Sequence, residues 1–155
     1  GEIVLGGISY LPQGSETSVV AHKLAPNRET VWSLTLGSAD YAAANSVAVD
    51  GDGHVVLAGL VRDGAVDFGC GAHDIPLDPE MSWAGDMLLA KLDAEGECLW
   101  SKTFGGDGNQ SAWGVATSSS GNVAIAGEFQ TEIDFGLGPL VAEHYPEPCI
   151  AWFGP

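Results

Sequence analysis

Short apolar segments alternate with glycine-rich turns along the whole chain. The segments are rich in Val, Leu, Ile and aromatic residues and are bounded by Gly, Asn, Asp, Pro or Ser, which is the pattern of β-strands. They lie at residues 19–24, 31–36, 46–49, 54–60, 87–92, 99–104, 113–116 and 122–128. None of them carries the apolar period of an amphipathic helix. The pattern therefore predicts an all-β protein without any helix longer than one or two turns.

The same pattern of residues occurs more than once. Lys23, Trp32, Val47 and Gly59 recur 68 positions later as Lys91, Trp100, Val115 and Gly127. Residues 1–7 match residues 53–59 in the same way and form a third, partial copy. Internal repeats of this length are typical of architectures in which neighbouring units bury one another's faces.

Several segments, such as 55–59, are apolar at consecutive positions, which predicts strands that are buried on both faces. Small four-stranded antiparallel sheets stacked around an axis achieve such burial while exposing only short edges. The repeat is therefore interpreted as a blade of a β-propeller. From the axis outward, the expected strands are 46–49, 54–60, 87–92 and 99–104.

By this interpretation, residues 1–155 form a single partial β-propeller domain of ten strands. Residues 1–37 would hold the second to fourth strands of one blade, residues 45–104 a full blade, and residues 112–155 the first three strands of another, about two and a half blades in total. Unpaired strands or uncovered apolar faces are expected at Ile3, Val4, Leu5, Ile150, Trp152 and Phe153. Further repeats of a longer parent protein, or a symmetric copy of the chain, would complete the propeller.

Three runs carry a resemblance to a known family: KLDAEGECLWSKTFGG at 91–106, GVATSSSGNVAIAG at 114–127 and IDFGLGPL at 133–140. They are similar to the bacterial SBBP-type β-propeller repeat, and VWSLTLG, SVAVDGDGHVVLAG and VDFGCG look like an earlier copy. The resemblance implies an exported or surface protein of bacteria and provides no catalytic residues. The inserts at 70–86 and 137–148 are longer than the family pattern.

The charge of the chain restricts its partners. Twenty-one acidic and five basic residues give a net charge of −16, which repels the phosphates of nucleic acids and anionic membrane surfaces. No run approaches the roughly 20 apolar residues of a membrane span, and no targeting signal is found within the chain. The expected location is secreted or on the cell surface, with any leader lying outside this sequence.

Three cysteines, Cys70, Cys98 and Cys149, allow one disulfide and leave one thiol. Cys70 lies in a long connection and is expected to be bridged. A bond to Cys98 would stabilise the fold by about 3 to 4 kcal/mol in the chain-entropy model. The propeller topology favours Cys149 instead, because Cys149 would begin a third strand on the same side of the disc as Cys70, whereas Cys98 would begin a fourth strand on the opposite side.

The long connections 61–86 and 129–148 would lie on one side of the disc, where elaborated loops on a rigid scaffold tend to bind ligands. The ligand-binding candidates are His73, Asp74, Trp83, Asp86, Trp113, Glu143, His144 and Tyr145. Asp78, Glu80 and Glu147 accompany them. Such a mixture suits a glycan, a protein or a divalent cation, but a solvated acidic loop with one aromatic anchor is the preferred interpretation.

Other motifs favour structural roles. Asp50 and Asp52 resemble part of a calcium loop, but a hairpin turn is preferred. No metal site or cofactor is therefore predicted, with calcium as the alternative. Trp32 and Trp100 are expected to pack, and Trp113 either plugs a central channel, the preferred interpretation, or lines a ligand pocket. The two Asp-Phe-Gly triplets, at 67–69 and 134–136, lack the other kinase motifs.

These patterns predict a non-enzymatic β-propeller segment of an exported bacterial protein that acts as a binding or structural module through its long-loop face. The alternatives are a purely structural surface or assembly protein and a propeller-type glycosidase or lyase. The small apolar residues of the innermost strands disfavour catalysis, which would need a unique cluster of acids near the axis. No catalytic residue is assigned.

Overall fold

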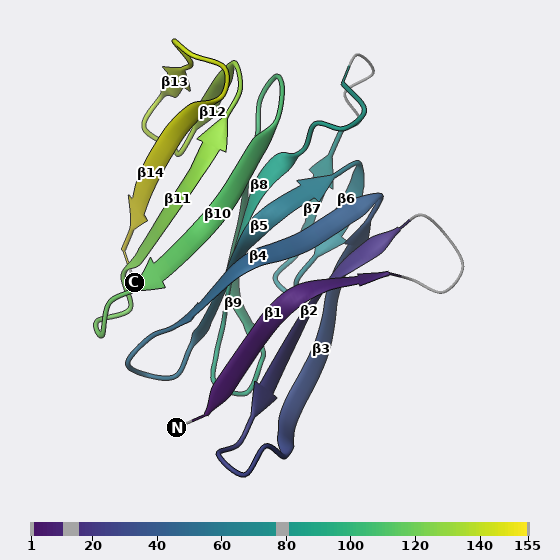
Figure 1. The fold of residues 1–155 in the computed structure, drawn as a ribbon, viewed down its shortest axis with the longest axis vertical. Coiled ribbons are helices and arrows are strands. Elements are labelled where there is room, and N and C mark those ends of the chain that lie inside the picture. The colour runs from purple at the N-terminus through teal and green to yellow at the C-terminus, as the bar shows by residue number, and fades with distance from the viewer. Residues whose placement is uncertain (1, 11–15, 77–80, 155) are drawn as a thin grey trace.

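The computed structural model describes residues 2–10, 16–76 and 81–154, and its regular elements are all β-strands (Figure 1). The strands are β1 (Ile3–Tyr10), β2 (Thr17–Leu24), β3 (Thr30–Ala39), β4 (Tyr41–Val49), β5 (Val55–Arg62), β6 (Gly64–Asp67), β7 (Ala72–Ile75), β8 (Asp86–Leu92), β9 (Cys98–Phe104), β10 (Gln110–Thr117), β11 (Val123–Phe129), β12 (Glu132–Asp134), β13 (Pro139–Val141) and β14 (Glu147–Phe153). Across the described residues, no helix is long and apolar enough to cross a membrane. The all-β prediction is confirmed.

Three antiparallel sheets contain every strand that the sequence predicted. The N-terminal sheet has the order β1-β2-β3, the central sheet β4-β5-β8-β9, and the C-terminal sheet β10-β11-β14. The order of the central sheet is the one expected from the repeat. Within the described residues, none of these sheets closes on itself.

Tight hairpins join β4 to β5, β8 to β9 and β10 to β11, as predicted. In each turn a side-chain oxygen at the first position accepts hydrogen bonds from backbone amides: Asp50 from Asp52 and His54, Asp93 from Glu95 and Glu97, and Ser118 from Asn122. The glycine at the fourth position has a positive φ in all three turns, a conformation that favours glycine. Short polar turns of this kind fix the register of the flanking strands.

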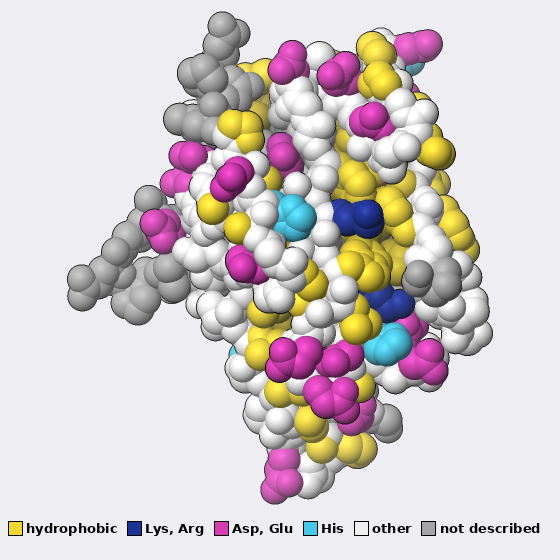
Figure 2. All heavy atoms as spheres, turned by 180° about the vertical axis from the view of Figure 1, so that it is seen from behind, with side chains coloured by type: hydrophobic (Ala, Val, Ile, Leu, Met, Phe, Trp, Pro, Cys, Tyr) yellow, Lys and Arg dark blue, Asp and Glu magenta, His cyan; other side chains and the backbone are white. Residues whose placement is uncertain are grey.

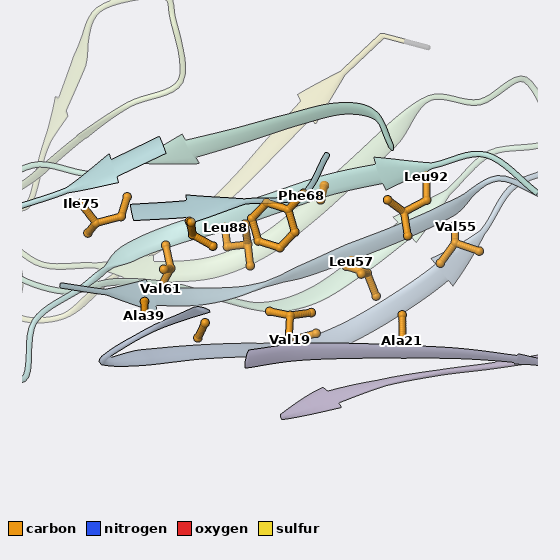
Figure 3. Close-up of a cluster of buried hydrophobic side chains, with 14 residues drawn as sticks. Val19, Ala21, Ala39, Val55, Leu57, Val61, Phe68, Ile75, Leu88 and Leu92 are labelled. Carbon is orange, nitrogen blue, oxygen red and sulfur yellow. The ribbon is translucent and has the colours of Figure 1, made fainter. Parts of the chain in front are cut away.

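Both faces of the central sheet are buried. Alternate side chains of β5 point to opposite faces, so Val55 and Leu57 enter one core and Val56 and Ala58 the other. The first core lies between the N-terminal and central sheets, and Figure 3 shows Val19 of β2 facing Leu57 across it. The second core lies between the central and C-terminal sheets. Consecutive apolar residues in the sequence therefore mark a strand packed on two sides, as predicted.

The sheets are closest at the edge formed by β4. There β1 and β2 lie against β4 from one side and β10 lies against it from the other, whereas the outer strand β3 lies against β6 instead of the central sheet's outer strands. The separation between neighbouring sheets therefore increases from β4 toward β9.

Two small hairpins, β6-β7 and β12-β13, fill the space between the outer strands of neighbouring sheets. Val66, Phe68 and Ile75 of the first hairpin segment join the first core, and Ile133 joins the second core. The sequence pattern predicts only long connections for both segments. The Asp-Phe-Gly triplets start the hairpin turns, because the Oδ1 atoms of Asp67 and Asp134 accept backbone hydrogen bonds from the residues that follow.

Hairpin β6-β7 also corrects the expected disulfide. Cys70 is bridged, as expected, but its partner is Cys98 and not Cys149. The chain after β5 forms the β6-β7 hairpin, and this hairpin places Cys70 beside the first residue of β9. The expectation that Cys70 and Cys98 lie on opposite sides of the disc is therefore wrong. Cys149 is a buried free thiol, and burial is the main cause of its raised pKa.

Two repeat glycines are explained by close approach of neighbouring strands. A Cβ atom on Gly59 would collide with the carbonyl oxygen of Ala43, and one on Gly127 would collide with that of Ser111. Both contacts occur where β4 and β10 contain a β-bulge. The equivalent Gly7 of β1 differs, since the nearest atom to its Cβ would be a methyl group of Val20 at 3.8 Å.

Candidate functional site

The candidate residues from the sequence lie in four separate places. His73 and Asp74 are on β7, Trp83 and Asp86 are before and at the start of β8, Trp113 is on β10, and Glu143, His144 and Tyr145 are between β13 and β14. Within the described chain, no hydrogen bond or ion pair joins one of these groups to another. Asp78 and Glu80 lie outside the described residues.

Several of these side chains make contacts that stabilise their own surroundings. The His73 imidazole Nε2 lies 2.7 Å from the Ser101 hydroxyl of β9. The Tyr145 hydroxyl donates a 2.7 Å hydrogen bond to Gln130 Oε1, and His144 Nδ1 lies 3.1 Å from a carboxylate oxygen of Glu147. These contacts fasten a hairpin and a loop to the sheets.

The remaining candidates do not converge on a common centre. Asp86 is half-buried beneath Gly105, where a Cβ atom would collide with its carboxylate, and burial raises the Asp86 pKa. Trp83 and Trp113 are exposed, as are Asp74 and Glu143. Trp113 occupies the position of Asn45, whose side-chain amide donates to the Ala112 carbonyl of the following sheet at 2.9 Å.

Asp50, Asp52 and His54 form a cluster of metal-ligand type, but the carboxylate of Asp50 is already engaged. Lys91 Nζ lies 3.1 Å and His54 Nδ1 lies 3.0 Å from Asp50 Oδ2. Burial alone would raise the Asp50 pKa, yet hydrogen bonds from Lys91, His54 and the Asp52 amide outweigh it and lower the pKa to about 2. A cation at this cluster would have to displace the Lys91 ammonium, so the donor set does not fit a metal well.

An apolar groove of about 890 Å³ lies beside β14 at the outer edge of the C-terminal sheet. Its walls include Trp100 and Lys102 of β9, Phe135 and Leu140 of the β12-β13 segment, and Ile150 and Trp152 of β14. Figure 2 shows hydrophobic side chains gathered on the rear of the molecule over this part of the stack. A cavity of this size is within the range of ligand sites.

Aromatic rings form the inner end of the groove. Phe104 stacks on Phe153 with ring centroids 5.3 Å apart and meets Phe135 edge-on at 5.1 Å. Around them Leu137 is 100% exposed, Ile150 is 80% exposed and Trp152 is 66% exposed. Lys102 is the one ionisable side chain among the described lining residues. The groove can therefore bind an apolar partner and has little acid–base chemistry to offer.

The sequence predicts only part of this groove. Its pattern places Ile150 and Trp152 on an uncovered apolar surface, which the structure confirms, and Ile3 and Leu5 are likewise exposed at the opposite end of the stack. Val4 is partly buried against the first core and Phe153 against the second, so these two residues are covered more than expected. Trp32 and Trp100 pack against the two cores, as predicted.

The sheets and the groove together define an all-β protein of stacked antiparallel sheets with an apolar surface at its outer edge. A scan of known protein-family models gives no match for the chain, and a search of curated proteins gives no significant match either.

Proposed function

We propose that this chain is a segment of a β-propeller of the SBBP repeat type, and that it acts as a non-enzymatic module that binds another polypeptide at its outer edge. The single observation that carries the binding function is the apolar groove between β9, the β12-β13 hairpin and the edge of β14. Its apolar walls favour a polypeptide over a glycan, because sugars need paired polar groups in addition to an aromatic surface.

The divergence of the three sheets supports the propeller interpretation. A sandwich of two layers has one core, whereas the central sheet here has a core on each face, and radial sheets must diverge toward the rim. Buried lysines link successive sheets in the same direction. Lys23 donates to the Ala94 carbonyl of the central sheet at 3.0 Å, and Lys91 donates to the Gly121 carbonyl of the C-terminal sheet at 3.1 Å.

The contacts of the candidate polar residues support a module without catalysis. His73, His144 and Tyr145 are each engaged in the local structure of a hairpin or loop. An acid and base pair for glycoside cleavage has to flank one substrate position, and the groove offers Lys102 in that role without a carboxylate among its described lining residues.

The disulfide between Cys70 and Cys98 is compatible with an exported protein, because disulfides persist in oxidising compartments. The disulfide therefore supports a location outside the cell or on its surface. The repeated unit also supports the assembly alternative, in which the same groove joins structural subunits to one another.

A peptide-display selection tests the proposed function. A random peptide library is selected on the whole chain and counter-selected on the Ile150→Thr, Trp152→Ser variant, and a glycan array is probed in parallel with and without calcium. We expect extended apolar peptides that bind the wild type and the matched Ile3→Thr, Leu5→Ser control, which removes similar exposed side chains at the opposite end of the stack. Glycan binding that survives in the groove variant, with no peptide enriched, would overturn the proposal.

A further inference from the structure

The outer edge of β14 corresponds to the strand edge along which an outer strand pairs in the other two sheets. The register shows this equivalence: Val55 of β5 pairs with Leu92 of β8, and its repeat counterpart Val123 of β11 pairs with Phe153 of β14. β14 therefore corresponds to β8. On β8 the next strand is β9, and on β2 it is β3, whereas within the described residues no strand pairs with the outer edge of β14.

The β12-β13 hairpin is placed to hold such a strand. In the central sheet, Cys70 and His73 fasten the β6-β7 hairpin to β9, through the disulfide to Cys98 and the hydrogen bond to Ser101. The Asp-Phe-Gly triplets align the two hairpins 67 residues apart, so Leu137 and Leu140 take the places of Cys70 and His73. Leu137 is fully exposed and Leu140 is half-exposed. Both fastening points are thus apolar and open toward the groove.

We propose that the groove receives an extended strand of the same sequence type as β3 and β9, the outer strand of a further repeat, which adds antiparallel to the edge of β14. The inference rests on the proposed function and names the polypeptide that the groove takes. β3 and β9 share the order apolar, Trp, Ser, any residue, Thr, apolar at 31–36 and 99–104. In the register of β9, where Trp100 pairs with Lys91, the incoming Trp would lie opposite Trp152.

The addition of a strand suits both the backbone and the side chains of this edge. An unpaired strand edge exposes amide and carbonyl groups that another strand can satisfy. A Trp opposite Trp152 forms an aromatic cross-strand pair. In this register the side chain at the position of Cys98 would cover Leu137, and the Ser of the shared pattern would lie over Leu140.

A disulfide trap tests the register as well as the binding. The whole chain with Leu137→Cys is mixed with a peptide of residues 97–105, which carries Cys98, and the products are mapped by mass spectrometry without reduction. We expect a bond between position 137 and the peptide cysteine, in imitation of the bond between Cys70 and Cys98. The matched control is Val141→Cys, at an exposed position on β13 outside the groove lining. Equal trapping at the two positions, or equal trapping of a scrambled peptide, would refute the proposal.

Fluorescence anisotropy with a labelled peptide, its Cys98 replaced by Ser, provides the equilibrium measurement. Leu137→Asp in the protein should weaken binding by about tenfold, because the incoming strand would bury an unpaired carboxylate. The control variant Leu99→Ser, made in the protein at an exposed site on β9, should leave the binding of the labelled peptide unchanged.

Other outcomes separate this inference from the proposed function. Library peptides that bind the groove without the Trp-Ser pattern would overturn the inference and leave the proposed function standing. A dimer in light scattering that the β9 peptide does not dissociate would assign the groove to a second copy of the chain, and would also overturn it.

Discussion

Lys91 Nζ lies 3.1 Å from the Oδ2 atom of Asp50, and the side chains of both residues are almost completely buried. Lys91 comes from the third strand of the central sheet and Asp50 from the turn that follows its first strand. The ammonium also donates to the Gly121 carbonyl of the C-terminal sheet. One buried ion pair therefore joins two strands of one sheet to a turn of the next.

The first prediction concerns this ion pair. Asp50→Asn leaves the Lys91 ammonium buried without its counter-charge and should lower the free energy of unfolding by about 3 kcal/mol. Urea denaturation followed by tryptophan fluorescence measures the loss. The double variant Asp50→Asn, Lys91→Met removes the buried charge as well and should recover more than half of the lost stability. A double variant as unstable as the single one would contradict this account of the pair.

The second prediction concerns acid stability. The Asp50 pKa in the folded protein is about 2, below the ordinary value of 3.8. A lowered pKa stabilises the fold above the unfolded value, and this contribution is lost as the pH falls through the folded value. The stability advantage of wild type over Asp50→Asn should therefore shrink by about 2 kcal/mol between roughly pH 5 and pH 2. The matched control is Asp52→Asn, the same substitution at an exposed position of the same turn.

The third prediction concerns the disulfide. Cys98→Ser opens a loop with a sequence separation of 28 residues and should cost about 3 kcal/mol of stability in the chain-entropy model. Mass spectrometry of a non-reduced digest should find the peptides of Cys70 and Cys98 joined. A maleimide should label one thiol, that of Cys149, and only after unfolding, because that side chain is buried. A joined peptide containing Cys149 would show that the hairpin does not reach β9.

The fourth prediction concerns three repeat-equivalent glycines. Gly59→Ala and Gly127→Ala should each lower the free energy of unfolding by about 2 kcal/mol, since a backbone carbonyl would have to shift to admit the methyl group. Gly7→Ala should be tolerated, because the same position on β1 has space for a Cβ atom. Thermal unfolding of the three variants measures the effect, and an equal loss in all three would show that the strand approach at the bulges is not its cause.

The strands and their order could be predicted because their sequence signals are local and are repeated. Consecutive apolar residues in 55–59 required two cores, and the copy of Lys23 and Trp32 at Lys91 and Trp100 fixed the correspondence between sheets. The turns followed from Asp, Ser and Gly residues, whose side chains and backbone preferences act within four positions.

The small hairpins and the groove depended on contacts between distant segments. β12 and β13 are only three residues long, too short for a clear alternating pattern, and their burial depends on the sheet beside them. The Asp-Phe-Gly triplets are the signal that the sequence offers, because each begins a hairpin turn. The sequence showed that Ile150 and Trp152 would be uncovered, but it did not show that Phe135 and Leu140 would join them. The incorrect choice of Cys149 as the disulfide partner has the same cause, because the position of Cys70 depends on how the β6-β7 hairpin packs.

The two ends of the stack expose different apolar surfaces, so the two end sheets are not equivalent. Among the described residues, Ile3 and Leu5 are exposed on the N-terminal sheet at one end, and Ile150 and Trp152 are exposed on the C-terminal sheet at the other. A contact between the two unlike ends is heterologous, since each copy contributes a different patch. Repetition of one heterologous contact either closes into a ring or grows into a filament, and the rotation between successive copies decides which.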